Sequence, residues 1–81
     1  MGGTLFTPHG AQRVLMRDVS GTGAQVSGDD AIPHSCDAVL KKGSLFVAAR
    51  VVRSRGADAG LQFYRELSPA ELDALFQPVL R

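Results

Sequence analysis

The sequence lacks most features of disulfide-linked, membrane-spanning or secreted proteins. It has a single cysteine, which excludes a disulfide within the chain and is typical of a reducing compartment. No apolar run reaches the length of about 18 residues that a membrane-spanning helix requires. The first residues lack the basic region and the apolar block of a secretion signal. We therefore expect a cytoplasmic protein with no membrane contact.

Catalytic and metal-binding motifs are also missing. The sequence has neither the Gly-x-Ser-x-Gly elbow of hydrolases nor the His-Glu-x-x-His motif of zinc enzymes. Its one cluster of His, Cys and Asp, at residues 34–37, offers fewer ligands than the paired clusters of a zinc site. We expect no enzyme, no metal ion and no cofactor. We expect instead a single small binding domain over residues 1–81.

Basic residues are distributed unevenly along the chain. Nine Lys and Arg stand against eight Asp and Glu, for a net charge of +1, yet residues 41–55 hold five basic side chains and no acidic one. This segment has Phe46 as its only aromatic residue, whereas proteins that bind single-stranded nucleic acid combine a basic groove with several stacking rings. A solvated face is the simplest interpretation, and we expect no DNA or RNA partner.

Short apolar stretches separated by turn residues predict an all-β fold. The candidate strands are residues 13–17, 24–26, 37–42, 44–54 and 61–65. Strands of this number and length usually close into a small antiparallel barrel, because closure removes exposed strand edges.

The end of the sequence changes character. A capping box with proline at the first helical position spans Ser68 to Glu71 and is a strong signal for a helix start. The apolar residues that follow recur at helical spacing and form one stripe: Leu72, Leu75 and Phe76. The pattern predicts a helix over residues 68–78, ending near Pro78. Since so short a helix is unstable alone, we expect it to pack on the barrel of five to six strands.

Several segments occur in an order that is specific to one family. Residues 18–23, Asp-Val-Ser-Gly-Thr-Gly, match the pattern Asp/Asn-x-Ser-x-x-Gly. They are followed by Val-Val-Arg-Ser at 51–54, Gly-Leu-Gln-Phe at 60–63 and Leu-Ser at 67–68, before the helix. Together these segments resemble the PilZ domain family, the bacterial receptor modules for cyclic di-GMP. The resemblance covers about residues 12–80 and implies a six-stranded barrel with a C-terminal helix. By this comparison the chain resembles a shortened member without the usual upstream Arg-x-x-x-Arg segment. Residues 4–7 are then a candidate stub of the first barrel strand, within a segment, 1–10, for which disorder is the alternative.

The resemblance also implies a ligand site. In the family, the turn motif contacts guanine edges, and an Arg-x-x-x-Arg element upstream of it grips phosphate and guanine. Carried over, Asp18 and Ser20 would hydrogen-bond the ligand, and Gly23 would keep the surface open. The only Arg-x-x-x-Arg here runs from Arg13 to Arg17 and touches the motif directly. On a strand these two residues would lie about 13 Å apart, too far for a flexible clamp.

Two functions follow from these observations. The first is a cyclic di-GMP receptor module in bacterial signalling. Its predicted ligand-binding residues are Arg13, Arg17, Asp18, Ser20 and Gly23. Either Arg13 and Arg17 or the basic stretch, with its arginines at 50, 53 and 55, would neutralise the phosphates.

The second function is that of a degenerate PilZ-like domain that binds no nucleotide and acts as an adaptor between proteins. It would use its barrel face or its helix, and exposed apolar surface near Phe46, Phe63 or Phe76 would favour it. In that case Asp18 and Ser20 only build a turn, and Gly23 is needed only for its backbone angles.

Overall fold

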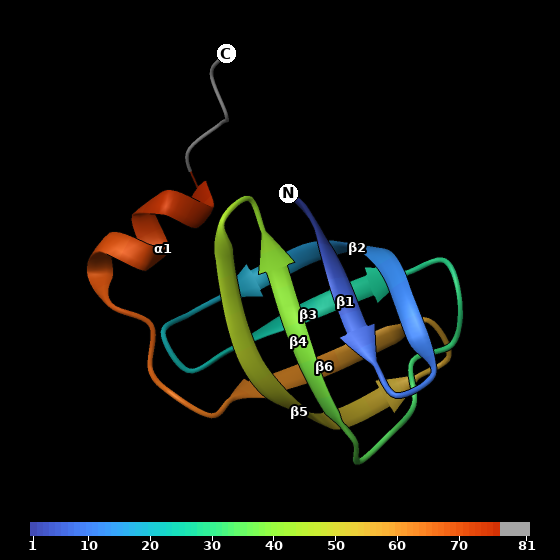
Figure 1. Cartoon of the computed structure of the whole chain (residues 1–81). Coiled ribbons are helices and arrows are strands. Elements are labelled where there is room, and N and C mark those ends of the chain that lie inside the picture. Colours follow the sequence, from blue (N-terminus) through green and yellow to red (C-terminus); the bar gives the residue numbers. More distant parts are fainter. Residues whose placement is uncertain (77–81) are drawn as a thin grey trace.

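The computed structural model describes residues 1–76 and shows a closed barrel of six antiparallel strands followed by one helix (Figure 1). In chain order the elements are β1 (Gly2–Thr7), β2 (Gly10–Val19), β3 (Gly23–Gly28), β4 (Asp37–Lys42), β5 (Leu45–Arg55), β6 (Asp58–Phe63) and α1 (Pro69–Phe76). Around the barrel the order is β1-β2-β3-β6-β5-β4, so β3 pairs with β6. This confirms the predicted fold class, with six strands. The described part of the chain has no helix long and apolar enough to cross a membrane.

Alternation along each strand determines which side chains fill the barrel. In β2, Val14 and Met16 are buried while Arg13, Leu15 and Arg17 are exposed. The most deeply buried large side chains come from four strands: Leu5 from β1, Val26 from β3, Leu40 from β4, and Val47 and Val51 from β5. Residues of β2 and β6 join them in the same core. The barrel therefore closes around a single apolar core, and every strand contributes one face to it.

Strand β1 is a full member of the barrel, longer than the predicted stub at residues 4–7. It pairs with β2 along its whole length and with β4 at its centre, and Leu5 is completely buried. A Cβ on Gly3 would lie 2.9 Å from the carbonyl oxygen of Lys41. Glycine weakens the sequence signal for a strand, yet here it permits the close approach of β1 to β4.

The hairpin between β5 and β6 is tighter than predicted. The turn contains only Gly56, with φ of 61°, and Ala57, so Asp58 to Gly60 belong to β6 and not to the loop. Tyr64 and Arg65, which were predicted to end the strand, lie beyond it. By contrast, β4 has the predicted bounds.

The capping box predicted for the helix is confirmed. The amide of Glu71 donates to Ser68 Oγ (3.2 Å), and the amide of Ser68 donates to Glu71 Oε1 (2.9 Å). Arg65 donates to both carboxylate oxygens of Glu71, each at 2.8 Å. These hydrogen bonds from Arg65, and then the one from Ser68, lower the pKa of Glu71 to about 2.

The apolar stripe of α1 is only partly covered. Leu75 is buried in the barrel core and Leu72 packs against it, whereas Phe76 is 58% exposed. The helix lies beside the barrel in Figure 1, and its described residues are Pro69–Phe76. The predicted extension to residue 78, with Pro78, lies outside the described residues.

Candidate functional site

The turn between β2 and β3 is organised by Ser20. The Ser20 amide donates to the Gly23 carbonyl (2.9 Å), and the Thr22 amide donates to Ser20 Oγ (3.3 Å). The Ser20 hydroxyl lies 3.3 Å from Thr22 Oγ1 and 3.4 Å from the Gly23 carbonyl oxygen. Asp18 takes no part in this network, and its carboxylate has no hydrogen bond or ion pair with any residue from 1 to 76. The turn thus occupies Ser20 and leaves the Asp18 carboxylate free.

Position 23 requires glycine because there is no room for a side chain, and not because of its backbone angles. The glycines with positive φ are Gly10, Gly43 and Gly56, so the interpretation of Gly23 as a residue needed for its φ is wrong. A Cβ on Gly23 would lie 2.4 Å from the carbonyl oxygen of Leu61. No real Cβ makes so short a contact with backbone, and any side chain here would push β3 away from β6.

Two β-bulges turn consecutive residues toward the outside of the barrel. The β2–β3 register shifts within residues 16–19, and the β5–β6 register shifts within residues 51–53. The exposed residues at these bulges are Arg17 and Asp18 in β2, and Val52 and Arg53 in β5. Bulges are a common means of re-aiming a side chain at a binding site. Here the two bulges lie on either side of a depression that crosses β3 and β6.

A hollow of about 270 Å³ lies between the two bulges. Its lining brings together three of the five predicted site residues, Asp18, Ser20 and Gly23, which lie at one end. Arg53 lines the same hollow from β5, on the far side of β6. The predicted turn motif therefore borders a real depression, and an arginine faces it across the barrel surface.

A second hollow, of about 340 Å³, continues the first along β5 and β6. The two share Gln25, Arg53 and Gly60 as lining residues, and the second extends to Arg55 and Asp58. We call the two together the motif groove. Because the hollows share their central residues, one ligand can lie across both.

The comparisons with known proteins decide the family of this chain. A scan against protein-family models matches residues 2–80 to the PilZ domain. The chain belongs to the PilZ domain family. No curated protein and no solved structure matches it significantly.

The two arginines predicted to bind ligand in this PilZ domain lie in different places. Arg13 lines another hollow, with Gly2, Gly3 and Thr4 at the β1–β2 pair, and is not brought to the motif groove. Arg17 is exposed at the β2 bulge, next to Asp18, but does not line the groove. The structure thus separates the two ends of the Arg-x-x-x-Arg segment.

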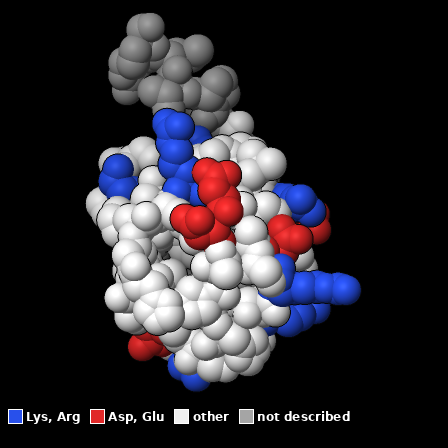
Figure 2. Space-filling model, turned by 90° about the vertical axis from the view of Figure 1, so that its right-hand side faces the viewer, with Lys and Arg blue, Asp and Glu red and all other residues white. Residues whose placement is uncertain are grey.

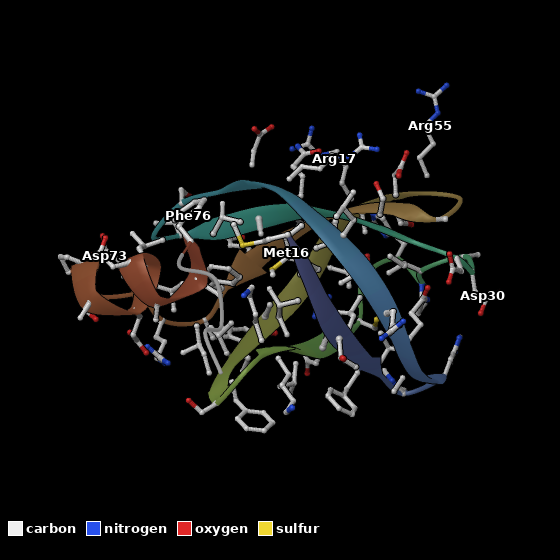
Figure 3. The ribbon with its side chains drawn as sticks, turned by 90° about the horizontal axis from the view of Figure 1, so that it is seen from above. Met16, Arg17, Asp30, Arg55, Asp73 and Phe76 are labelled. Atoms are coloured by element: carbon white, nitrogen blue, oxygen red, sulfur yellow. The ribbon has the colours of Figure 1, made fainter. Side chains whose placement is uncertain are left out.

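The charged residues that line the groove are two arginines, Arg53 and Arg55, and two aspartates, Asp18 and Asp58. The ion pairs within residues 1–76 are Arg50 with Asp37 (3.7 Å) and Arg65 with Glu71 (2.8 Å), both away from the groove. Arg17 and Arg55 project from the same side of the barrel in Figure 3. Basic side chains also gather at the right-hand edge of the face in Figure 2, beside acidic ones. The groove arginines are therefore available to an anionic ligand.

Three residues lie at the centre of the groove, Gln25, Arg53 and Gly60. Sequence reasoning gave Gln25 no role in the site and placed Gly60 at a turn. It offered Arg53 only as one of several basic residues that could face the phosphates. Gly60 pairs with Gln25 on one side and with Arg53 on the other. That arrangement depends on the pairing of β3 with β6, which no local pattern contains.

Over residues 1–76, no three His, Cys, Asp or Glu side chains gather closely enough to hold a metal ion. The His and Cys of the 34–37 cluster make local contacts instead: His34 Nδ1 lies 2.5 Å from Ser35 Oγ, and Cys36 Sγ lies 3.5 Å from the Pro33 carbonyl oxygen.

Proposed function

We propose that this PilZ domain binds cyclic di-GMP in the motif groove and acts as a receptor module in bacterial second-messenger signalling. The observation that carries the proposal is the convergence of Asp18, Ser20 and Gly23 with Arg53 around one depression. The family to which the chain belongs is a family of receptors for this nucleotide. We expect the domain to work in the cytoplasm, in keeping with its single free cysteine.

The chemistry of the groove suits a ligand with two guanines and two phosphates. The free carboxylate of Asp18 is an acceptor for the N–H donors of a guanine edge, and Gln25 can supply an amide to the same base. The planar guanidinium of an arginine recognises phosphate oxygens, or guanine O6 and N7, through paired hydrogen bonds. Gly23 contributes because it has no side chain, and a side chain at this position would occupy part of the groove.

Equilibrium binding tests the proposal, with cyclic di-AMP as the matched control ligand. The two ligands share the same sugar–phosphate ring and differ only in the bases, so base recognition is measured directly. We expect saturable binding of cyclic di-GMP, at least about tenfold tighter than that of cyclic di-AMP, because an unmatched base leaves buried polar groups unpaired. Absence of binding of cyclic di-GMP at millimolar concentration would contradict the receptor function.

A second function, that of a protein adaptor, is favoured by a separate observation. An apolar hollow of about 340 Å³ crosses β1, β4 and β5, and its lining includes Phe6, Val39, Ala48 and Tyr64. Phe6 is 40% exposed and Tyr64 is 59% exposed. Exposed aromatic side chains that border an apolar hollow are typical of surfaces that bind other proteins.

The exposed apolar surface does not include all the residues that were expected to form it. Phe63 is buried in the core, so it contributes no surface. Phe46 is 55% exposed and has the Lys41 ammonium 5.6 Å from its ring centre.

A photo-crosslinking residue at position 64 tests the adaptor function in cells, with the same residue at position 55 as control. A partner captured from position 64 alone supports it, and capture from neither position contradicts it.

A further inference from the structure

We propose that Arg53, assisted by Arg55, holds the phosphate groups of the ligand in this PilZ domain, a role that the Arg-x-x-x-Arg segment at residues 13–17 does not fill. The inference rests on the proposed function and names the residues through which the groove recognises the anionic part of the nucleotide. Its basis is the position of Arg53 at the centre of the groove.

Arg53 is one of only a few residues that line both hollows of the motif groove. It borders the hollow that contains Asp18 and Ser20, and also the hollow that extends to Arg55. From Asp18 on β2 to Arg53 on β5 the surface crosses β3 and β6, which is three strand spacings or about 14 Å. An extended dinucleotide that contacts Asp18 through one base therefore reaches Arg53 through its sugar–phosphate ring.

The Arg53 side chain is directed over the floor of the groove. A Cβ built on Gly60 would lie 3.5 Å from Arg53 Cβ and 3.7 Å from Arg53 Nε. The Arg53 side chain, out to Nε, thus lies over the bare backbone of β6 at the centre of the groove. Gly60 pairs with Gln25 on β3 and with Arg53 on β5, so these two residues flank the same bare position.

Arg53 and Arg55 have no acidic partner in the part of the chain that the structure describes. The ion pairs there use Arg50 and Arg65 instead. An exposed guanidinium without an internal partner can form charge-assisted hydrogen bonds to phosphate without breaking an existing contact. The β5 strand therefore carries one paired arginine, Arg50, and two unpaired ones that border the groove.

Acidic residues at both ends of the groove restrict where the phosphates can lie. Asp18 is at one end, and Asp58, whose Oδ1 accepts a hydrogen bond from Ser27 Oγ (2.6 Å), is at the other. Like charges repel, so phosphates are disfavoured beside either carboxylate and favoured beside Arg53 between them. This order, acidic then basic then acidic, matches a ligand whose central phosphates separate two bases that carry N–H donors.

Calorimetric titration with cyclic di-GMP tests the inference on the whole chain and four variants. Arg53→Gln and Arg55→Gln each remove one groove charge. Arg50→Gln, on the same strand but paired with Asp37, and Arg13→Gln, in another hollow, are the matched controls. Each variant changes an exposed side chain, and an unchanged melting temperature will confirm that it folds.

We expect Arg53→Gln to weaken binding by about tenfold or more, and Arg55→Gln by a smaller factor. Both controls should stay within about twofold of the unmodified chain. The affinity of the unmodified chain should fall as salt increases, and this dependence should be smaller in Arg53→Gln.

The outcomes separate this inference from the receptor function. If the unmodified chain binds cyclic di-GMP and Arg53→Gln binds equally well, the assignment of Arg53 is wrong and the receptor function stands. Loss of binding in Arg13→Gln, with Arg53→Gln unaffected, would also overturn the assignment. If the unmodified chain fails to bind, both the receptor function and this inference are wrong.

Discussion

The position that a Cβ would take on Gly23 lies 2.4 Å from the carbonyl oxygen of Leu61. This contact joins the first residue of β3 to β6 at the point where the turn motif meets the motif groove. The same absent side chain lets the barrel close and keeps one end of the groove open. Gly23 is therefore needed both for the close packing of β3 on β6 and for the open end of the groove.

Replacing Gly23 with alanine should destabilise the barrel. The new methyl group meets backbone and not a flexible side chain, so β3 and β6 must separate, at a cost of about 1–3 kcal/mol. Urea unfolding measures this cost. Gly2→Ala is the control, because a Cβ at Gly2 meets nothing within 4 Å. Equal unfolding free energies for the two variants would contradict the steric role of Gly23.

Asp18 and Ser20 should respond differently to substitution. Ser20→Ala removes the side-chain hydrogen bonds of the turn and should cost about 0.5–1.5 kcal/mol of stability. Asp18→Asn breaks no hydrogen bond within residues 1–76 and should change stability by less than about 0.5 kcal/mol. It should nevertheless weaken cyclic di-GMP binding by about tenfold, since a charged acceptor is lost. Urea unfolding and calorimetry on both variants check this, and unaltered binding by Asp18→Asn would remove Asp18 from the site.

The core role of β1 can be tested with two neighbouring residues. Leu5 is completely buried, so Leu5→Ala should cost about 2–5 kcal/mol. Phe6 points outward and is 40% exposed, so Phe6→Ala should cost about 1 kcal/mol or less. Thermal and urea unfolding compare the two. Similar costs for both would mean that β1 is not an integral strand of the barrel.

The contribution of Glu71 to stability should depend on pH. Hydrogen bonds from Arg65, and then from Ser68, lower the pKa of Glu71 from 4.5 to about 2 in the folded chain. Because the folded pKa lies below the unfolded one, the stabilisation is complete above pH 4.5 and is lost as the pH falls toward about 2. The melting-temperature difference between the unmodified chain and Glu71→Gln should shrink over that range.

Asp73→Asn is the control for this titration. Asp73 lies on the same helix but makes no ion pair in the chain as described, to residue 76. The melting-temperature difference between the unmodified chain and Asp73→Asn should not shrink by a comparable amount between pH 4.5 and about pH 2. A difference for Glu71→Gln that stays constant at acid pH would contradict the role of the Arg65–Glu71 contact.

Much of the fold could be predicted from local patterns. β4 has the predicted bounds because an apolar run is limited by Asp37 and by the turn at Gly43. The capping box of α1 uses residues three apart, so its signal lies entirely within one turn of helix. β1 was underestimated because Gly2 and Gly3 carry little strand propensity, and only the contact with β4 explains Gly3.

Only those residues of the candidate site that lie close together in the sequence were predictable from it. Asp18, Ser20 and Gly23 belong to one six-residue motif, and all three border the groove. Arg53 is 30 or more residues away and reaches them through the β3–β6–β5 pairing and the bulge in β5. Neither register shifts nor non-local pairings leave a periodic signal in the sequence. The sequence therefore offered several arginines for the phosphates, and only the folded chain places Arg53 at the centre of the groove.

The central claim is that cyclic di-GMP occupies the motif groove. Titration of isotope-labelled protein with cyclic di-GMP, followed through backbone amide shifts, tests it most directly. The account predicts saturable shifts centred on Asp18, Ser20, Gly23, Gln25 and Arg53. Amides at Phe6 and Tyr64, which border the other hollow, should remain unchanged. No shifts at millimolar ligand, or shifts confined to Phe6 and Tyr64, would contradict the claim.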